Sequence, residues 1–343
     1  MIVNLSECGS FNKEITVGNC IEGFSIILIS YRHDQYFEDA LNSIRDQTYD
    51  HKKIQLIIVC KSNGMPINII NKSSFDFEVE IIIDDNFPIG NKFANAVRKA
   101  RYAWISVLDD DDFWVPLKLE FLEHIILSKN NVGYIHNSKE LIVESLKYSS
   151  MREKLGTVKG SLMDSIEIDT HSRAECEHNG SSITFNTKII KYKTQFMQKL
   201  TGGIDTFLFV CANISGLSVL CIPYKLTYFR VSDFASDPAH LLALLSNLNR
   251  QLQSYEVMAN IPNLSKEMMT LLTYRISNNK LKELILNFKN VNNSNRFLDL
   301  ISVLKKFYIF KKPMDVFFLI TAFLSVLFPK MSLFIYLILK KHL

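Results

Sequence analysis

Residues 102–114 read YAWISVLDDDDFW, in which an apolar run ends in four consecutive aspartates, Asp109 to Asp112. The apolar run predicts a buried strand, and the following Phe113 and Trp114 close the acidic turn. Four like charges at the end of a strand repel each other and destabilise the fold unless a cation lies there. Mg²⁺ and Mn²⁺ typically bind one or two carboxylates together with substrate phosphates. The turn is therefore predicted to bind a divalent metal and a phosphorylated ligand, with a solvated acidic turn as the alternative.

Strand-like and helix-like segments alternate on the N-terminal side of this stretch and continue after it. The expected strands are residues 24–29, 54–60, 78–83 and 104–108, and the expected helices are residues 37–47, 93–103 and 117–127. Such alternation predicts crossover units and a mostly parallel sheet flanked by helices, an α/β fold. In such sheets ligands bind at the carboxyl ends of the strands, where this chain has Ser30, Cys60, Asp84 and Asp109. Residues 136–182 are expected to be irregular and to lie on the acceptor side. Strand and helix are expected to return at 183–231, and the chain from about Pro238 is expected to be all helical.

Composition narrows the class of protein. The 343 residues suffice for two domains, and 48% of them are hydrophobic, which is ample for a core. The net charge of +4 is small and the basic residues form no single stripe, so nucleic acid is not an expected partner. The six cysteines show no CxxC spacing and are predicted to be buried thiols in a reducing compartment. The N-terminal residues lack a basic segment followed by an apolar one, so we expect no signal peptide and a catalytic part that faces the cytosol.

Five segments, taken in order, resemble the family 2 glycosyltransferases with the GT-A fold. They are FSIILISYRHDQYFEDALNSIRDQT (24–48), GNKFAN (90–95), LDDDDFW (108–114), GGID (202–205) and IPYKLTYFR (222–230). Each segment alone is a weak signal, but their order along residues 24–232 is specific. The resemblance implies a GT-A-type sheet, a D-x-D motif that binds Mn²⁺ or Mg²⁺, and a nucleotide-sugar donor.

The resemblance also implies roles for the acidic turn. Asp111 is the expected direct metal ligand. Asp109 is expected to complete the metal site by holding the ribose of the donor or a water of the metal. Asp112 has an alternative role as the cap of the helix that begins near Pro116.

The donor is expected to contact residues at the ends of the first three strands and at the start of the helix that follows. Ser30 and Tyr31 belong to the loop after the first strand, where Tyr31 stacks on the base or else belongs to the core. In the family the second strand usually ends in aspartates that contact the base, but here it ends in Cys60-Lys61. Asp84, or else Asp85 beside it at the end of the third strand, is therefore expected to take over the base contact, unless the donor differs from the usual uridine nucleotide. Lys92 is expected to reach the phosphates, with a solvated helix start as the alternative.

Asp205 lies where the family places its catalytic base. General base catalysis is worth typically ~10²–10⁴-fold, and a single base opposite the leaving group implies inversion at the anomeric carbon. The alternative is that Asp205 only caps the helix that follows. The segment Asn179–Ser182 resembles a small-residue loop that the family uses near the sugar. Four residues close to it, His171, Glu175, Glu177 and His178, fit no standard metal spacing and are interpreted as a solvated loop.

The C-terminal part predicts an extension that associates with a membrane. Residues 296–310 have the pattern of a basic amphipathic helix, and two apolar runs too short to span a bilayer follow at 316–328 and 331–339. We therefore expect three parts: a GT-A catalytic domain at 1–235, a helical extension with the amphipathic helix at 236–312, and a hydrophobic helical hairpin that anchors the chain at 313–343. A buried hairpin packed on the catalytic domain, or a contact in a homo-oligomer, is the alternative.

These observations predict an inverting, metal-dependent glycosyltransferase at the cytoplasmic face of the cell membrane. Its donor is a nucleotide-sugar and its acceptor a lipid-linked or surface glycan. One alternative is a polyprenyl-phosphate sugar synthase, whose anionic acceptor needs no base. The other is a degenerate, non-catalytic partner subunit, which Cys60-Lys61 suggests.

Overall fold

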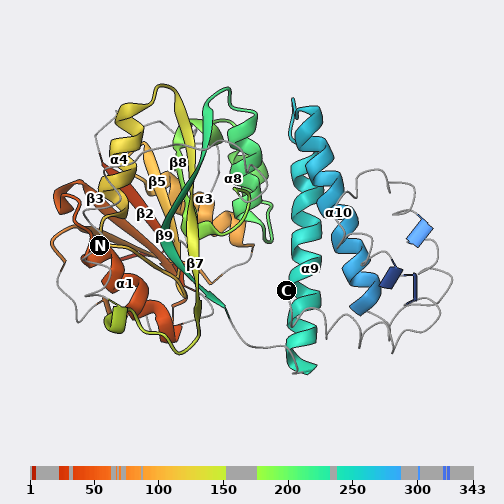
Figure 1. The fold of residues 1–343 in the computed structure, drawn as a ribbon, viewed down its shortest axis with the longest axis horizontal. Coiled ribbons are helices and arrows are strands. Elements are labelled where there is room, and N and C mark those ends of the chain that lie inside the picture. Colours follow the sequence, from red (N-terminus) through yellow and green to blue (C-terminus); the bar gives the residue numbers. More distant parts are fainter. Residues whose placement is uncertain are drawn as a thin grey trace. The chain divides into compact units, whose positions relative to one another are not determined.

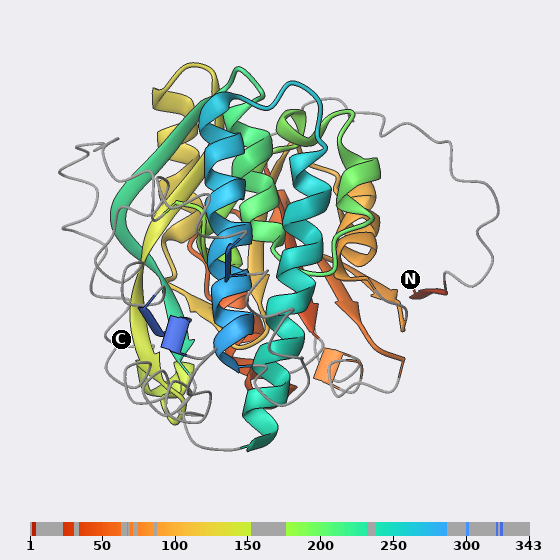
Figure 2. The ribbon, with the colours of Figure 1, turned by 90° about the vertical axis from the view of Figure 1, so that its right-hand side faces the viewer.

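The computed structural model divides the chain into two compact units (Figures 1 and 2). The first unit contains residues 1–198 and 204–232, and the second contains residues 199–203 and 233–343. The residues that the structure describes are 2–4, 23–30, 34–62, 67, 69–70, 75–85, 88–151, 176–231, 238–286, 300–301, 320–321 and 323–324.

A nine-stranded mixed sheet forms the centre of the first unit, in the order β1-β4-β3-β2-β5-β8-β7-β9-β6. The strands are β1 Ile2–Asn4, β2 Phe24–Ser30, β3 Ile54–Cys60, β4 Glu78–Ile83, β5 Trp104–Asp109, β6 Phe113–Trp114, β7 Val132–Val143, β8 Ile183–Asn186 and β9 Ser218–Val231. Strands β1 to β5 pair in parallel. Strand β8 runs antiparallel to β5 and β7, β7 and β9 are parallel, and β6 is antiparallel to β9. The α/β fold with a mostly parallel sheet is therefore confirmed.

The strand order reverses between β2 and β5. Strands β3 and β4 extend the sheet on one side of β2, and β5 pairs on its other side. A reversal of this kind leaves a crevice at the carboxyl ends of the two central strands, where ligands bind in open α/β sheets. The two strand ends at this crevice are Ser30 and Asp109.

Helices cover both faces of the sheet. On one face α1 (Phe37–Arg45) and α4 (Lys118–Ser128) bury Leu41, Ile44 and Phe121 in one cluster with Leu28 and Leu56 of the strands. Figure 1 shows α4 and α8 (Ile204–Asn213) on opposite sides of the sheet, and α3 (Ile89–Lys99) contacts β2 and β3. Shorter helices are α7 (Thr194–Met197) and 3₁₀ turns at Asp34–Tyr36, His51–Lys53, Gly180–Ser182 and Thr187–Ile190.

Some local expectations were wrong. Residues 136–143 are not irregular, because β7 pairs with β9 as far as Val143. The polar side chains that argued against a strand have partners: His136 Nε2 lies 2.6 Å from His178 O, and Asn137 Nδ2 donates to Thr227 Oγ1 at 3.0 Å. The helix expected at 93–103 begins at Ile89 and ends at Lys99, and strand β1 was not expected.

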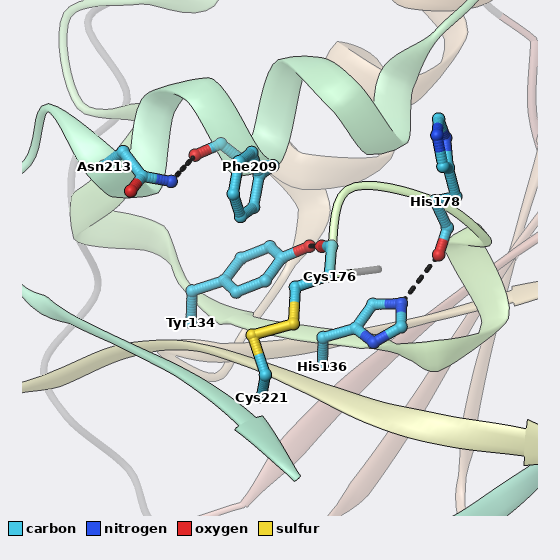
Figure 3. The surroundings of a disulfide bond; sticks show 7 residues. All are labelled: Tyr134, His136, Cys176, His178, Phe209, Asn213 and Cys221. Atoms are coloured by element: carbon cyan, nitrogen blue, oxygen red, sulfur yellow. Dashed lines mark hydrogen bonds between the residues drawn. A yellow bond between two sulfur atoms is a disulfide. The ribbon is translucent and has the colours of Figure 1, made fainter. Parts of the chain in front are cut away.

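The cysteines also differ from the expectation of buried thiols throughout. Cys176 and Cys221 form a disulfide bond (Figure 3), whereas Cys60 and Cys211 are buried free thiols. The bond ties the segment before Asn179 to β9. Figure 3 also shows the Tyr134 hydroxyl next to this bond, where it donates to the carbonyl of Cys176 at 2.6 Å.

The described part of the second unit is a helical hairpin. Helices α9 (Pro238–Ala259) and α10 (Lys266–Leu286) lie side by side in both views of the fold, and Asn279 Nδ2 donates to Gln251 Oε1 between them at 3.3 Å. The expected helical character after Pro238 is confirmed for these residues. None of the helices among the described residues combines the length and the apolar character needed to cross a membrane. The predicted amphipathic helix at 296–310 and the apolar runs up to 339 lie almost wholly outside the described residues.

Candidate active site

The acidic turn follows β5 at the sheet's reversal point. Asp110 and Asp112 are buried, and Asp109 and Asp111 are partly exposed, so alternate carboxylates are accessible. The Ser30 hydroxyl at the end of β2 donates to Asp110 Oδ2 at 3.0 Å. Ser30 therefore lies at the acidic turn, where its hydroxyl is hydrogen-bonded to the Asp110 carboxylate. Tyr31 lies outside the described residues.

Asp112 binds the neighbouring strand and does not cap a helix. Its Oδ1 accepts a hydrogen bond from the backbone N–H of Arg230 on β9 at 2.9 Å. Helix α4 is preceded by Leu117, and no side chain caps it. The expected cap near Pro116 is therefore wrong, and Asp112 instead ties the acidic turn to β9.

Arg230 holds the far side of the same turn. Its Nε donates to the Asp111 carbonyl at 2.9 Å, and Nη1 donates to the carbonyls of Glu144 and Leu146 at 2.7 and 2.6 Å. Its Nη2 pairs with Asp39 Oδ2 at 3.2 Å, and both side chains are largely buried. The guanidinium is thus committed to the protein's own oxygens, so Arg230 supports the turn.

The loop Asn179–Ser182 connects the acidic turn to the expected catalytic base. The Asp109 backbone N–H donates to Ser181 Oγ at 3.0 Å, and Ser181 Oγ lies 3.5 Å from Asp109 Oδ2. At the other end, the Asn179 N–H donates to Asp205 Oδ2 at 3.3 Å. A Cβ atom on Gly180 would lie 3.1 Å from Asp109 Oδ2, so the loop approaches the carboxylate closely. One short loop therefore contacts both a metal-motif aspartate and Asp205.

Asp205 is the second residue of α8 and is partly buried. Its Oδ1 accepts from the N–H of Thr206 at 2.9 Å. Burial raises the pKa of the Asp205 carboxyl and the charge of Glu177 adds to the rise, while His178 and the two N–H donors oppose it. Asp205 thus accepts one hydrogen bond within the first turn of α8 and a second one from the loop.

The expected solvated loop around residues 171–178 is not what the described residues show. Glu177 is buried and its Oε1 lies 3.5 Å from the Thr206 hydroxyl. His171 and Glu175 lie outside the described residues. Glu177 and His178 therefore belong to the surroundings of Asp205.

Burial, followed by the crowding of like charges, raises the pKa of Asp109 and Asp112. Burial raises the pKa of Asp109 well above its usual value, and the charges of Asp112, Asp111, Asp110 and Asp205 raise it further. Burial, with the charge of Asp111, also raises the pKa of Asp112 to about 7. Asp112 Oδ2 is buried without a hydrogen-bond partner. The turn thus carries more negative charge than its protein partners neutralise.

The same turn was tested for its fit to a divalent cation. Among the described residues, no group of three or more His, Cys, Asp or Glu side chains could hold a metal ion. Mg²⁺ and Mn²⁺ sites at phosphates need only one or two carboxylates, because the substrate supplies further oxygens. Partly exposed Asp109 and Asp111, in a turn with excess negative charge, fit such a shared site.

Asp84 and Lys92 lie at the end of β4 and in the first turn of α3. The Asp84 N–H donates to the Cys60 carbonyl at 3.1 Å, and Asn95 Nδ2 lies 3.5 Å from Asp84 Oδ2. Lys92 is buried, and burial lowers the pKa of its amine to about 8, against the opposing charge of Asp84. A plain solvated helix start is therefore wrong for Lys92.

Four residues of the site were not assigned roles from the sequence: Ser181, Lys118, Glu177 and Arg230. Lys118 is fully buried, and its Nζ donates to the Ser181 carbonyl at 2.7 Å. At the sequence level Lys118 is one lysine at the start of a helix, where solvation is the normal expectation. Arg230 is the last residue of the segment IPYKLTYFR, but this sequence pattern does not indicate that the guanidinium donates to backbone carbonyls.

The comparisons with known proteins place part of the chain in a described family. Residues 25–170 match the family described as glycosyl transferase family 2. The Escherichia coli enzyme WfgD, a UDP-Glc:alpha-D-GlcNAc-diphosphoundecaprenol beta-1,3-glucosyltransferase, is 26% identical over 120 residues, which are 34% of this chain and 46% of WfgD. The chain spans 38–49% of the length of the curated relatives that it matches.

Solved structures share the fold at low sequence identity. The structure of S. aureus TarS 1–349 superposes with a TM-score of 0.56 and 12% identity, covering 88% of this chain and 90% of that one. The mannosyltransferase PcManGT from Pyrobaculum calidifontis, in complex with GDP-Man and Mn²⁺, gives a TM-score of 0.54 and 13% identity, covering 98% and 91%. At these identities the likeness concerns the fold.

The fold and the family match together point to a glycosyltransferase domain within this chain. Residues 25–170 form a glycosyl transferase family 2 domain, within a unit that has the GT-A fold. The family predicted from the five sequence segments is confirmed.

Proposed function

We propose that the chain transfers a sugar, with inversion, from a nucleotide-sugar donor to the hydroxyl group of a glycan acceptor. The observation that carries this proposal is the loop Asn179–Ser182, which contacts Asp109 at one end and Asp205 at the other. Inverting transfer needs a leaving-group site and a base on opposite sides of the sugar carbon. The two groups joined by this loop suit those two tasks.

At the donor end, Asp109 and Asp111 are the proposed ligands of Mn²⁺ or Mg²⁺. When bound, such an ion supplies Lewis-acid neutralisation of the diphosphate leaving group. Lys92 supplies a further positive charge toward the phosphates, and Asp84 is the proposed contact to the base. The complex of PcManGT with GDP-Man and Mn²⁺ supports divalent metal use by a protein of this fold.

At the acceptor end, Asp205 is the proposed general base. A carboxylate whose pKa is raised by burial accepts a proton more readily than an exposed one. Its Oδ2 is held by the Asn179 N–H, which keeps it beside the loop. Deprotonation of the acceptor hydroxyl by Asp205 promotes attack on the face opposite the leaving group, and this inverts the anomeric carbon.

The acceptor is proposed to be a lipid-linked or surface glycan at the cytoplasmic face of a membrane. WfgD, by its name, acts on a diphosphoundecaprenol-linked sugar, and this supports the proposal. The basic and apolar sequence of residues 296–343 supports membrane association.

Transfer to a polyprenyl phosphate is the second candidate. In that reaction the acceptor already carries negative charge, so Asp205 would have no proton to remove. A non-catalytic subunit is the third candidate, on the observation that β3 ends in Cys60 and is followed by Lys61, where the family usually has aspartates.

The test is a panel of nucleotide sugars offered to the purified full chain with Mn²⁺, with donor binding, donor hydrolysis and transfer measured separately. Asp111→Asn should abolish metal-dependent donor binding while the fold survives. Asp205→Asn should lower transfer by ~10²–10⁴-fold and leave donor affinity near that of the wild type. The control is Asp50→Asn, because Asp50 also accepts a backbone N–H, from Lys52 at 3.0 Å, at the opposite end of β3.

The outcomes separate the candidates. Near-normal transfer to an alcohol acceptor by Asp205→Asn would exclude Asp205 as the base. Transfer to a polyprenyl phosphate alone, unaffected by that substitution, would establish the second candidate. Absence of binding and hydrolysis for every donor in the wild type would establish the non-catalytic subunit.

A further inference from the structure

Lys118 is a fully buried lysine that contacts the loop Asn179–Ser182, which connects Asp109 to Asp205. Its Nζ donates to the Ser181 carbonyl at 2.7 Å and to the Thr227 hydroxyl at 3.1 Å, and it lies 4.1 Å from the centre of the Trp114 ring. The groups in these contacts are neutral. Burying an amine in this way is costly, and burial lowers the pKa of Lys118 well below its usual value, although the charge of Asp112 favours the protonated form.

Three donors converge on one backbone oxygen. The Ser181 carbonyl accepts from Lys118 Nζ, from Trp114 Nε1 at 2.8 Å and from Thr227 Oγ1 at 3.0 Å. Asn137 Nδ2 in turn donates to Thr227 Oγ1 at 3.0 Å, which orients that hydroxyl toward Ser181. We call Trp114, Lys118 and Thr227 the carbonyl clamp. A backbone oxygen with three side-chain donors from three different elements is held more firmly than ordinary loop backbone.

The carbonyl clamp fixes the backbone of Ser181, and the side chain of Ser181 contacts Asp109 of the proposed metal motif. Ser181 Oγ accepts from the Asp109 N–H, and two residues earlier the Asn179 N–H donates to Asp205. Any shift of the Ser181 backbone therefore moves contacts at both ends of the loop. Asn179 itself has a φ of +76°, a conformation that an L-residue adopts at a cost, so the loop depends on its surroundings to keep its shape.

We propose that Lys118 is a positioning residue, which fixes the Ser181 carbonyl and thereby sets the placement of the Asp205 base relative to the Asp109–Asp111 metal motif. This inference rests on the proposed function, and it predicts a specific kinetic signature. Misplacing reacting groups by about 1 Å can cost ~10²-fold in rate, whereas a donor held mainly by other residues stays bound. The loss therefore falls on kcat for transfer, and the donor KM changes little.

The test compares Lys118→Met, Thr227→Val and the double variant in the full chain. Both substitutions keep nearly the same shape and remove a donor to the Ser181 carbonyl. We expect kcat for transfer to fall by ~10–10²-fold in each single variant, with donor KM within about threefold of the wild type. Because both residues act through one oxygen, the double variant should lose less than the product of the two single effects.

A second readout does not depend on activity. Hydrogen exchange should accelerate at the backbone N–H groups of Asp109 and Ser182, which donate to Ser181 Oγ and to the Asn179 carbonyl. The control is Lys129→Met, because Lys129 is exposed at the end of the same helix α4 and should change neither kcat nor this exchange.

Each outcome bears on the proposal. Unchanged kcat and unchanged exchange in folded Thr227→Val, or independent multiplication of the two effects, would overturn the positioning role even where the wild type transfers sugar. If the wild type binds no donor but hydrogen exchange is still accelerated in the variants, the positioning role is retained and the proposed function is rejected. If Lys118→Met fails to fold, Thr227→Val alone decides the matter by the same two measurements.

Discussion

Replacing Arg230 by Met removes the guanidinium that donates to the backbone of the acidic turn. The contacts of Arg230 allow the loss in the free energy of unfolding to be estimated. The Arg230 guanidinium pairs with Asp39 at 3.2 Å, and the side chains are 2% and 11% exposed. Removing one partner of a buried pair typically destabilises a protein by ~3–5 kcal/mol, because the other charge is left without compensation. The carbonyls of Asp111, Glu144 and Leu146 also lose their donor, at ~1 kcal/mol or more each where water does not replace it.

Water will reach some of these oxygens, so we expect a total loss of about 4–6 kcal/mol in the free energy of unfolding for Arg230→Met. For a unit of this size each kcal/mol shifts Tm by ~2–4 °C, so Tm should fall by about 10–20 °C. The assay is thermal unfolding of the full chain, followed by denaturant unfolding at one temperature to obtain the free energy directly.

The control for Arg230→Met lies on the same strand. Lys225 of β9 forms an ion pair with Glu140, but both side chains are substantially exposed. Exposed pairs contribute little because water screens them, so Lys225→Met should leave Tm nearly unchanged. A loss of Tm in Arg230→Met no larger than that in Lys225→Met would refute the reasoning. Restoration of stability by adding Asp39→Asn to Arg230→Met would identify the uncompensated Asp39 charge as the main cost.

Two further predictions concern the donor site and the C-terminal residues. Burial lowers the pKa of the Lys92 amine to about 8, so its positive charge is lost as pH rises through that value. Donor KM should therefore rise between about pH 7 and pH 9 in the wild type. In Lys92→Arg it should stay constant over this range, because the guanidinium remains charged. A donor KM that does not change with pH in the wild type would exclude a contact between Lys92 and the phosphates. Deleting residues 313–343 should release the chain from lipid vesicles in a flotation assay and leave donor hydrolysis measurable, whereas a truncated chain that unfolds with or without lipid would show that these residues are core.

The parts of the fold that were predictable from sequence are those with a strong local pattern. Strand β3 is buried at all seven positions, and the apolar run from Leu56 to Cys60 is what distinguished it in the sequence. The helical face of Phe37, Ala40, Leu41 and Ile44 is fully buried as its spacing indicated. When strands and helices alternate, the strands run parallel and their carboxyl ends lie at one edge of the sheet. The position of the acidic turn at that edge could therefore be predicted from the sequence.

Strand β7 shows where the local pattern fails. Its residues from His136 to Glu140 are polar, and polar runs ordinarily indicate loops. In the fold they are tolerated because partners from distant segments satisfy them, such as the His178 carbonyl for His136 and Thr227 for Asn137. The disulfide is a similar case, since Cys176 and Cys221 are separated by 45 residues in the sequence. Strand β8, which follows Cys176 in the chain, and strand β9, which contains Cys221, both pair with β7.

The carbonyl clamp was beyond sequence reasoning for a different reason. Its centre is a backbone oxygen, which no pattern of side chains reveals. Lys118 read as an ordinary lysine because helix starts are normally solvated, and Trp114 read as the end of a motif. The tertiary fold decides the matter by burying both against Ser181. Residues that position a site through main-chain atoms are therefore the class that sequence patterns miss most readily.

The four aspartates of the turn divide between support and chemistry in a way that only the structure reveals. Asp110 is committed to the Ser30 hydroxyl and Asp112 to the Arg230 N–H, and both are buried. Asp109 and Asp111 are partly exposed, and the pKa of Asp109 is raised first by burial and then by the charges of the neighbouring aspartates. Such crowding costs stability, and a bound cation relieves it because anything that binds only the native state stabilises that state. The turn after β5, in which the Asp112 N–H donates to the Asp109 carbonyl at 3.3 Å, thus leaves the residues at positions i and i+2 partly exposed, and this is the spacing of the D-x-D motif that we propose binds a shared cation.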